Sequence, residues 1–97
     1  MQQAGAPQGG GERVERILAR VRAIPPGFVR TYGDVDPKAP RLVGRVLATT
    51  DEPVPWHRVV RADGTAAMGD VQLARLRREG VPLRHGRVDL ARARIPW

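Results

Sequence analysis

Apolar residues recur at helical spacing near the start of the chain. Val14, Ile17, Leu18 and Val21 fall on one face of a helix that we expect over residues 12–24. Arginines occupy the other face, which is typical of a solvated surface. A Pro-Pro-Gly run follows directly and predicts a sharp end to this helix.

A second helix is expected over residues 41–49, where an apolar face lies opposite a face of small and cationic residues. The members of that second face are Arg41, Gly44, Arg45 and Ala48. A glycine inside a helix costs about 1 kcal/mol relative to alanine, so something should compensate at Gly44. Close approach to a flat polyanion and tight packing against another helix explain it equally well.

Between and after these helices the pattern predicts short elements. Thr31 and Asp34 have the spacing of a capping box and predict a helical turn, which the prolines that follow keep short. Residues 56–61 are typical of a strand. An Asp-Gly turn follows them, and residues 65–67 are candidates for a short return strand.

The last third of the chain predicts a third helix and a hairpin. Asp70 is suited to cap a helix over residues 71–79, and Gly80 is a typical stop signal. Residues 81–84 and 87–90 flank a His-Gly pair and predict a hairpin. The fold class that we expect is mainly α with small β-hairpins.

The chain has 97 residues, which corresponds to a single domain. Residues 1–11 contain only small and polar residues after Met1, so we expect a disordered N-terminal tail there and a folded domain over residues 12–97. The final residues, 91–97, read as a basic tail that ends in an aromatic.

The charge of the chain points to a polyanionic partner. The net charge is +7, and the cations are 16 arginines and Lys38. Guanidinium forks match phosphates better than ammonium groups do, which favours a nucleic acid. Genomic base composition is an alternative source of the arginines, but it does not explain the shortage of balancing acids.

Several functional classes are disfavoured by the composition. There is no cysteine, so the chain has no thiolate ligand or nucleophile. Two distant histidines, His57 and His85, do not predict a metal site, and we expect no cofactor. Since neither a signal peptide nor a membrane-spanning run is evident, we expect a cytoplasmic protein without membrane contact.

One stretch, Pro55-Trp56-His57-Arg58-Val59-Val60, resembles the Pro-Cys-His-Arg-Val motif of O6-alkylguanine-DNA alkyltransferases. Trp56 stands where the reactive cysteine would be, a substitution that marks the alkyltransferase-like proteins. The similarity runs from about Val14 to Gly80. Its other motifs are Ile24-Pro25-x-Gly27, Thr31-Tyr32-Gly33, Arg41-x-Val43-Gly44, Gly64 and Glu79-Gly80.

The resemblance implies a small domain with a winged helix-turn-helix that docks in the DNA minor groove. It implies that Tyr32 crowds a phosphate and that Arg41 enters the stack vacated by an extruded base. The DNA-binding residues implied in this way are Thr31, Tyr32, Arg41, Gly44, Arg45 and Ala48. The lesion-pocket residues implied are Trp56, His57, Val59, Val60, Gly64, Met68 and Glu79.

Two features depart from the family pattern. Tyr32 and Arg41 are only nine positions apart, so we expect the first helix of the helix-turn-helix to be stunted or lost. Some relatives carry basic residues in the loop that faces the lesion. Here that loop, residues 66–69, offers only the soft apolar side chain of Met68.

The expected function is therefore a non-enzymatic reader of DNA damage. The resemblance implies that the protein binds O6-alkylguanine in duplex DNA, flips it and flags it for nucleotide excision repair proteins. We expect a monomer. Alternatives are a sequence-specific or architectural helix-turn-helix protein that has lost base flipping, and a residual hydrolase acting through His57 and Glu79. Beside the pair of His57 and Glu79 we see no third group that would make a nucleophile.

Overall fold

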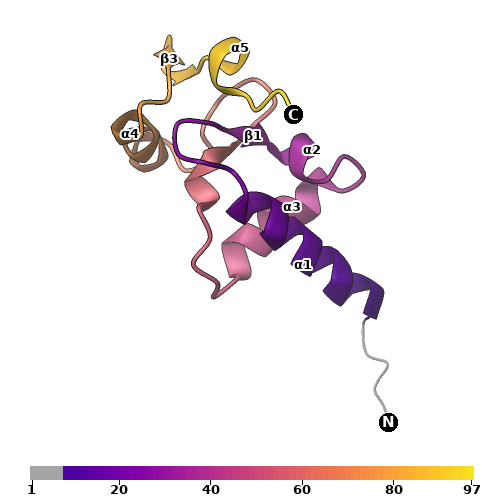
Figure 1. Ribbon diagram of the computed structural model, residues 1–97. Helices are drawn as coiled ribbons and strands as arrows, with labels where there is room; N and C mark the ends of the chain where they lie inside the picture. The colour runs from indigo at the N-terminus through magenta and orange to yellow at the C-terminus, as the bar shows by residue number, and fades with distance from the viewer. Residues whose placement is uncertain (1–7) are drawn as a thin grey trace.

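The computed structural model describes residues 8–97 as five α-helices, one 3-10 turn and two small sheets (Figure 1). In chain order the elements are α1 (Gln8–Arg22), β1 (Arg30–Thr31), α2 (Tyr32–Val35), α3 (Pro40–Thr49), the 3-10 turn η2 (Trp56–Arg58), β2 (Val59–Val60), α4 (Asp70–Arg78), β3 (Leu83–Arg84), β4 (Arg87–Val88) and α5 (Leu90–Ala93). The expected class, mainly α with small strands, is confirmed. None of the helices described is long and apolar enough to cross a membrane.

Helix α1 begins earlier than the sequence pattern indicated. It starts at Gln8, so residues 8–11, which we expected in a disordered tail, belong to the helix. Residues 1–7 of that tail lie outside the described part of the chain. The predicted apolar stripe is confirmed, because Ile17, Leu18 and Val21 are all at most 3% exposed.

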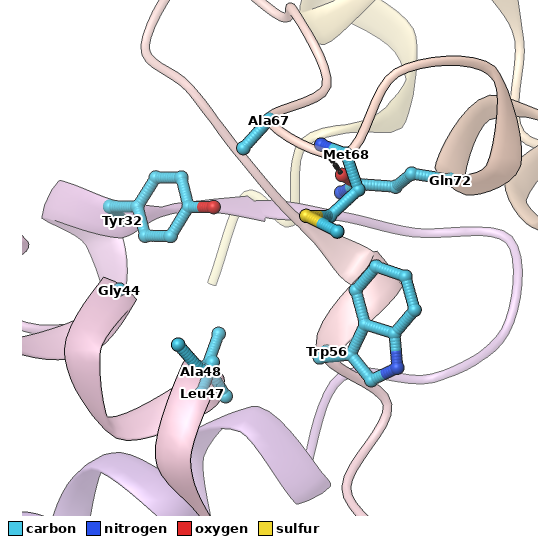
Figure 2. Close-up of a pocket in the computed structure, with 8 residues that line it drawn as sticks. All are labelled: Tyr32, Gly44, Leu47, Ala48, Trp56, Ala67, Met68 and Gln72. Carbon is cyan, nitrogen blue, oxygen red and sulfur yellow. Dashed lines mark hydrogen bonds between the residues drawn. The ribbon is translucent and has the colours of Figure 1, made fainter.

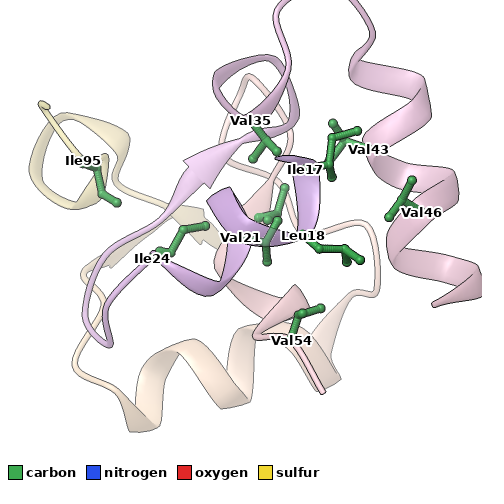
Figure 3. Packing of buried hydrophobic residues seen from close by; sticks show 10 residues of the cluster. Ile17, Leu18, Val21, Ile24, Val35, Val43, Val46, Val54 and Ile95 are labelled. Atoms are coloured by element: carbon green, nitrogen blue, oxygen red, sulfur yellow. The ribbon is translucent and has the colours of Figure 1, made fainter. Parts of the chain in front are cut away.

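The buried side chains form two clusters on either side of a short parallel sheet. One cluster joins α1, α2 and α3 with Val59 and Ile95 (Figure 3). The other joins α4 and the C-terminal segment around Val60 and Val29. Successive residues of a strand point to opposite faces, so Val59 and Val60 of β2 enter different clusters.

Strand β2 differs from the prediction in length and partner. Residues 56–58 form the η2 turn rather than a strand, and β2 pairs in parallel with β1 instead of with residues 65–67. The carboxylate of Asp63 accepts hydrogen bonds from both the backbone N–H and the hydroxyl of Thr65. Such local bonds compete with strand pairing. The two valines of β2, buried on both faces, suit a covered parallel pair.

Helix α2 is a single turn, as the short spacing between Tyr32 and Arg41 predicted. The capping box is present: the Thr31 hydroxyl accepts from the Asp34 N–H, and the Asp34 carboxylate accepts from the Thr31 N–H. Asp36 ends the turn and forms a bidentate ion pair with Arg13 of α1. The Arg13 guanidinium holds the pKa of the Asp36 carboxyl down to about 2.

Helix α4 begins one residue earlier than expected, and Asp70 lies in its first turn rather than capping it. Gly69, with a φ of +64°, takes the cap position, and Gly80 ends the helix with a φ of +82°. The hairpin of β3 and β4 is confirmed. Its second strand stops at Val88, and Leu90 begins α5 instead of continuing the strand.

The C-terminal residues fold back onto the start of the chain. Arg94 forms an isolated parallel β-bridge with Val29 through the backbone, and its guanidinium makes a bidentate ion pair with the Asp34 carboxylate. Ile95 is 6% exposed within the larger cluster, and the Trp97 ring packs edge-on against Phe28. The segment that the sequence presents as a basic tail is therefore a structural part of the domain.

Candidate DNA-binding site

A cavity of about 500 Å³ opens between α2, α3, the η2 turn and the start of α4 (Figure 2). Its lining carries no charged side chain and is mostly apolar. The lining residues are Tyr32, Gly44, Leu47, Ala48, Trp56, Ala67, Met68 and Gln72. Tyr32 and Trp56 stand on opposite sides of the opening in Figure 2, with the Met68 thioether beside the indole.

Tyr32 is held at the cavity by the capping box of α2. It is the first residue of that helix, and Thr31, which precedes it, is 4% exposed with its hydroxyl engaged in the cap. Burial raises the pKa of the Tyr32 phenol, and the nearby charge of Arg61 opposes this effect. At neutral pH the phenol therefore keeps its proton and is able to donate a hydrogen bond.

Trp56 begins the η2 turn, and Pro55 precedes it as the N-cap. Its indole packs edge-on against the ring of His57, with the ring centroids 5.9 Å apart. The guanidinium carbon of Arg75, from α4, lies 5.4 Å from the centroid of the same indole. The indole thus contacts the His57 ring edge-on and has the Arg75 guanidinium near it.

Behind the cavity, Glu79 joins the end of α4 to the η2 turn. Its carboxylate accepts from Arg58 Nε at 2.9 Å and Arg58 Nη2 at 2.7 Å, and His57 Nε2 lies 3.0 Å from it. Arg58 also donates to the carbonyl of Ile24 at the end of α1. The Arg58 guanidinium, helped by His57, lowers the pKa of the Glu79 carboxyl to about 2.

Gln72 is a site residue that the sequence analysis missed. It is 1% exposed, and its amide donates to the carbonyls of His57 and Val59 while its Oε1 accepts from the Met68 N–H. These bonds fasten α4 and the loop with Met68 to the Trp56 turn. Its spacing of four residues from Leu76, on the buried face of α4, was the signal available in the sequence.

One face of α3 lies beside the cavity and carries two exposed cations, Arg41 and Arg45. Within residues 8–97 neither guanidinium lies within ion-pair distance of a carboxylate. Gly44 lies between them, and a Cβ built on it would have the Tyr32 ring as its nearest neighbour, at 3.8 Å. This is an ordinary contact, so tight helix packing does not explain the glycine.

The predicted pocket residues fall into three groups. Trp56 and Met68 line the cavity, together with Tyr32 and other members of the predicted DNA-binding set. His57 and Glu79 lie behind it as a hydrogen-bonded pair. The remaining three are in the interior, where they shape the fold rather than the lining: Val59, Val60 and Gly64.

Gly64 has a specific structural role. Its φ is +85°, and a Cβ there would stand 2.5 Å from the carbonyl oxygen of Val88. The Val88 N–H donates to the Gly64 carbonyl at 2.9 Å. Gly64 thereby lets the β3–β4 hairpin lie directly against the turn that follows β2.

The chemical groups around the cavity are mainly aromatic and apolar. The cavity lining offers no thiol or paired nucleophile, and the chain contains no cysteine. Among residues 8–97, no three His, Cys, Asp or Glu side chains come together as a metal site would require. What the site does offer is two aromatic rings around an apolar space, next to a cationic helix.

Comparison with known proteins places this chain in a family. Residues 12–81 match the family described as 6-O-methylguanine DNA methyltransferase, DNA binding domain. The chain is 42% identical over 92 residues to the DNA base-flipping protein of Escherichia coli K12, covering 82% of this chain and 71% of that one. It is 33% identical over 81 residues to alkyltransferase-like protein 1 of Schizosaccharomyces pombe, covering 70% and 75%.

The fold matches as well. The crystal structure of S. pombe Atl1 in complex with damaged DNA containing O6-carboxymethylguanine superposes with a TM-score of 0.74 at 28% identity. The match covers 89% of this chain and 97% of that one. Some relatives are named methyltransferases, but this chain has Trp56 in the Pro-x-His-Arg motif and no cysteine. The chain therefore belongs to the family of the 6-O-methylguanine DNA methyltransferase DNA-binding domain, as one of its cysteine-less, alkyltransferase-like members.

Proposed function

We propose that the protein binds O6-alkylguanine in duplex DNA, turns the damaged nucleotide into the cavity beside Trp56, and leaves the alkyl group in place. The observation that carries the proposal is the cavity itself. A volume of about 500 Å³ falls within the range of small-molecule sites, and its lining is uncharged. An alkylated base needs such a space because it must leave the stack to be inspected.

The two rings give the extruded base a favourable environment. Stacking of a base on an aromatic side chain is worth about 1–3 kcal/mol, and turning a base out of the duplex costs a few kcal/mol. Trp56 and Tyr32 line opposite sides of the cavity, and Met68 adds a soft apolar contact. An O6-alkyl group weakens base pairing, so turning the alkylated base out of the duplex costs less free energy than turning out normal guanine.

The face of α3 is suited to the DNA backbone and the gap left by the base. Arg41 and Arg45 are exposed, and Gly44 and Ala48 between and beyond them carry little bulk. We assign Arg41 to the vacated stack and Arg45 to a phosphate. Tyr32, protonated at neutral pH, donates to the rotated phosphate.

Alkyl transfer needs a nucleophile that this chain lacks. In the absence of a thiolate, binding ends in a long-lived complex rather than in repair. We propose that a monomer on cytoplasmic DNA marks the lesion in this way for nucleotide excision repair proteins. A cell-based test compares alkylation survival with and without this protein, in strains with and without excision repair. Protection that persists without excision repair would contradict the coupling.

The central experiment measures binding to an O6-methylguanine duplex and to the matched guanine duplex by fluorescence anisotropy. We expect tighter binding to the lesion, and about a tenfold loss of lesion affinity for Trp56→Ala, Tyr32→Ala and Arg41→Ala. Arg92→Ala, in α5, is the control for loss of one charge. Equal affinities for the two duplexes would contradict damage recognition, and label from a [methyl-³H] lesion on the protein would contradict the absence of transfer.

A second candidate function is a sequence-specific or architectural helix-turn-helix protein. The observation that favours it is the length of α2, which is a single turn over Tyr32–Val35 before α3. A footprint that follows sequence and ignores the lesion would establish this alternative. A 2-aminopurine base placed next to the lesion that brightens on binding would instead favour base flipping, because its stacking neighbour has left the duplex.

A further inference from the structure

A cation lies close to the indole of Trp56, a side chain that lines the cavity, although the lining itself includes no cation. Arg75 lies on α4, three residues after Gln72, and its guanidinium carbon is 5.4 Å from the centroid of the Trp56 ring. Gln72 is bonded to the backbone of the η2 turn and of the Met68 loop, so the start of α4 is fixed relative to the indole. The position of Arg75 follows from that anchor.

The charge of Arg75 is available to a ligand. Within the described residues it has no carboxylate partner, because Glu79, one turn further along α4, is occupied by Arg58 and His57. Contact with an indole face at an exposed site contributes only about 0.5–1 kcal/mol and leaves the guanidinium donors free. Other cations near the lining are Arg61, close to Tyr32, and the two exposed arginines of α3.

We propose that Arg75 makes the pocket selective for O6 substituents that carry a negative charge, such as carboxymethyl, over neutral substituents of the same size. The inference rests on the proposed function and names the adduct class that the site prefers. A guanidinium matches a carboxylate with two parallel hydrogen bonds, and charge-assisted bonds are stronger than neutral ones. The uncharged lining strengthens this attraction, because little else near the indole competes for the donors.

The test uses three duplexes that differ only at O6: carboxymethyl, its neutral carbamoylmethyl amide of the same shape, and unmodified guanine. Binding constants are measured at fixed salt for the full-length protein and for Arg75→Gln, Arg75→Lys and Arg78→Ala. Arg78 is an exposed cation of the same helix and controls for the loss of charge. Thermal unfolding of each variant checks that it is folded.

We expect the unaltered protein to favour carboxymethyl over the amide by about tenfold. Arg75→Gln should bring this ratio close to one, Arg75→Lys should keep part of it, and Arg78→Ala should weaken binding to all three duplexes while leaving the ratio unchanged. The preference should also fall with rising salt, because it is electrostatic.

Two failures can be told apart. If both adducts bind better than guanine but Arg75→Gln leaves the carboxymethyl-to-amide ratio unchanged, the role of Arg75 is overturned and the proposed function stands. If all three duplexes bind equally to the unaltered protein, the proposed function fails, and this inference fails with it. A ratio that Arg78→Ala reduces as much as Arg75→Gln would point to the general charge of α4 instead.

Discussion

Gly44 lies in the middle of α3, and nothing within residues 8–97 requires it to be a glycine. A Cβ there would be 3.8 Å from its nearest neighbour, Tyr32 Cε1, and its φ is helical. Of the two explanations that the sequence left open, tight helix packing has no support in the structure. The cost of the glycine is therefore consistent with a surface that an external partner approaches closely.

Replacing Gly44 by alanine should separate stability from binding. We expect Gly44→Ala to raise the free energy of unfolding by about 0.5–1 kcal/mol, because alanine is the better helix former and the added methyl group fits. We expect the same change to weaken DNA binding severalfold, since the methyl group would keep α3 away from the duplex. Urea unfolding and anisotropy measure the two quantities. Unchanged affinity would argue against contact at this face.

Gly64 provides the contrast, because its glycine is required by the fold. We expect Gly64→Ala to lower the free energy of unfolding by at least about 2 kcal/mol, since the backbone is left-handed and the Val88 carbonyl stands 2.5 Å from the new Cβ. Urea unfolding of this variant beside Gly44→Ala checks the prediction. If both variants changed the free energy of unfolding in the same direction, the geometry described for one of the two glycines would be contradicted.

At the scale of elements, the interface between α4 and the η2 turn decides the shape of the cavity. Gln72 closes one end of this interface and Glu79 the other, so the indole of Trp56 is presented by two polar anchors. Glu79 receives bonds from Arg58 and His57, and Arg58 extends the connection to the end of α1. The Glu79 carboxylate thus joins three elements through side chains that contact it directly.

The acid stability of the domain should report this anchor. The pKa of Glu79 is lowered from 4.5 to about 2, so its ionised form stabilises the fold above pH 4.5, and that contribution is lost as the pH falls towards 2. Glu79→Gln should lower the free energy of unfolding by about 2–3 kcal/mol at pH 7 and much less at pH 2. Urea unfolding across this range measures the difference.

Asp36 remains in the Glu79→Gln variant and also titrates at about 2, so some dependence on acid should persist. The matched control is Glu52→Gln, because Glu52 pairs with Arg22 at an exposed site. Exposed pairs contribute little, so this control should change stability by less than about 1 kcal/mol. A Glu79→Gln loss of the same size at pH 2 and pH 7 would contradict the electrostatic origin.

For the whole molecule, the ion pairs sort the cations into structural and available groups. Arg13, Arg58 and Arg94 are engaged by carboxylates that hold elements together. The two arginines on the exposed face of α3 have no such partner among the described residues. The net charge of +7 is therefore not distributed evenly over the surface, because these two arginines of α3 lie together beside the cavity.

The salt dependence of DNA binding should reflect that division. Each phosphate neutralised contributes about 0.9 to the slope of log affinity against log salt concentration. Arg45→Ala should reduce the slope by about 1, whereas Arg92→Ala, on α5 away from α3, should leave it unchanged. Titrations at four or more salt concentrations measure both slopes. Equal reductions would mean that the duplex does not contact a defined face.

The elements with strong local signals were predictable. The apolar stripe of α1, the capping box at Thr31 and the Gly80 stop depend on neighbours in the sequence, and all three are present. The short β2 and the helical start of α5 were not predictable. Their conformations depend on partners far along the chain, with Arg30 opposite Val59 and Ile95 against the main core.

The sequence by itself determined the family and the loss of the thiol, because both depend on which residues are present and in what order. Tertiary structure alone decided which of them surround the cavity. Val59 and Val60 follow Trp56 directly, yet strand geometry buries them in two separate clusters. Gln72 and Arg75 are distant from Trp56 in sequence, yet Gln72 bonds the backbone of the η2 turn and Arg75 lies near the indole, because α4 packs against that turn. Proximity across elements is set by packing, and spacing along the chain does not encode it.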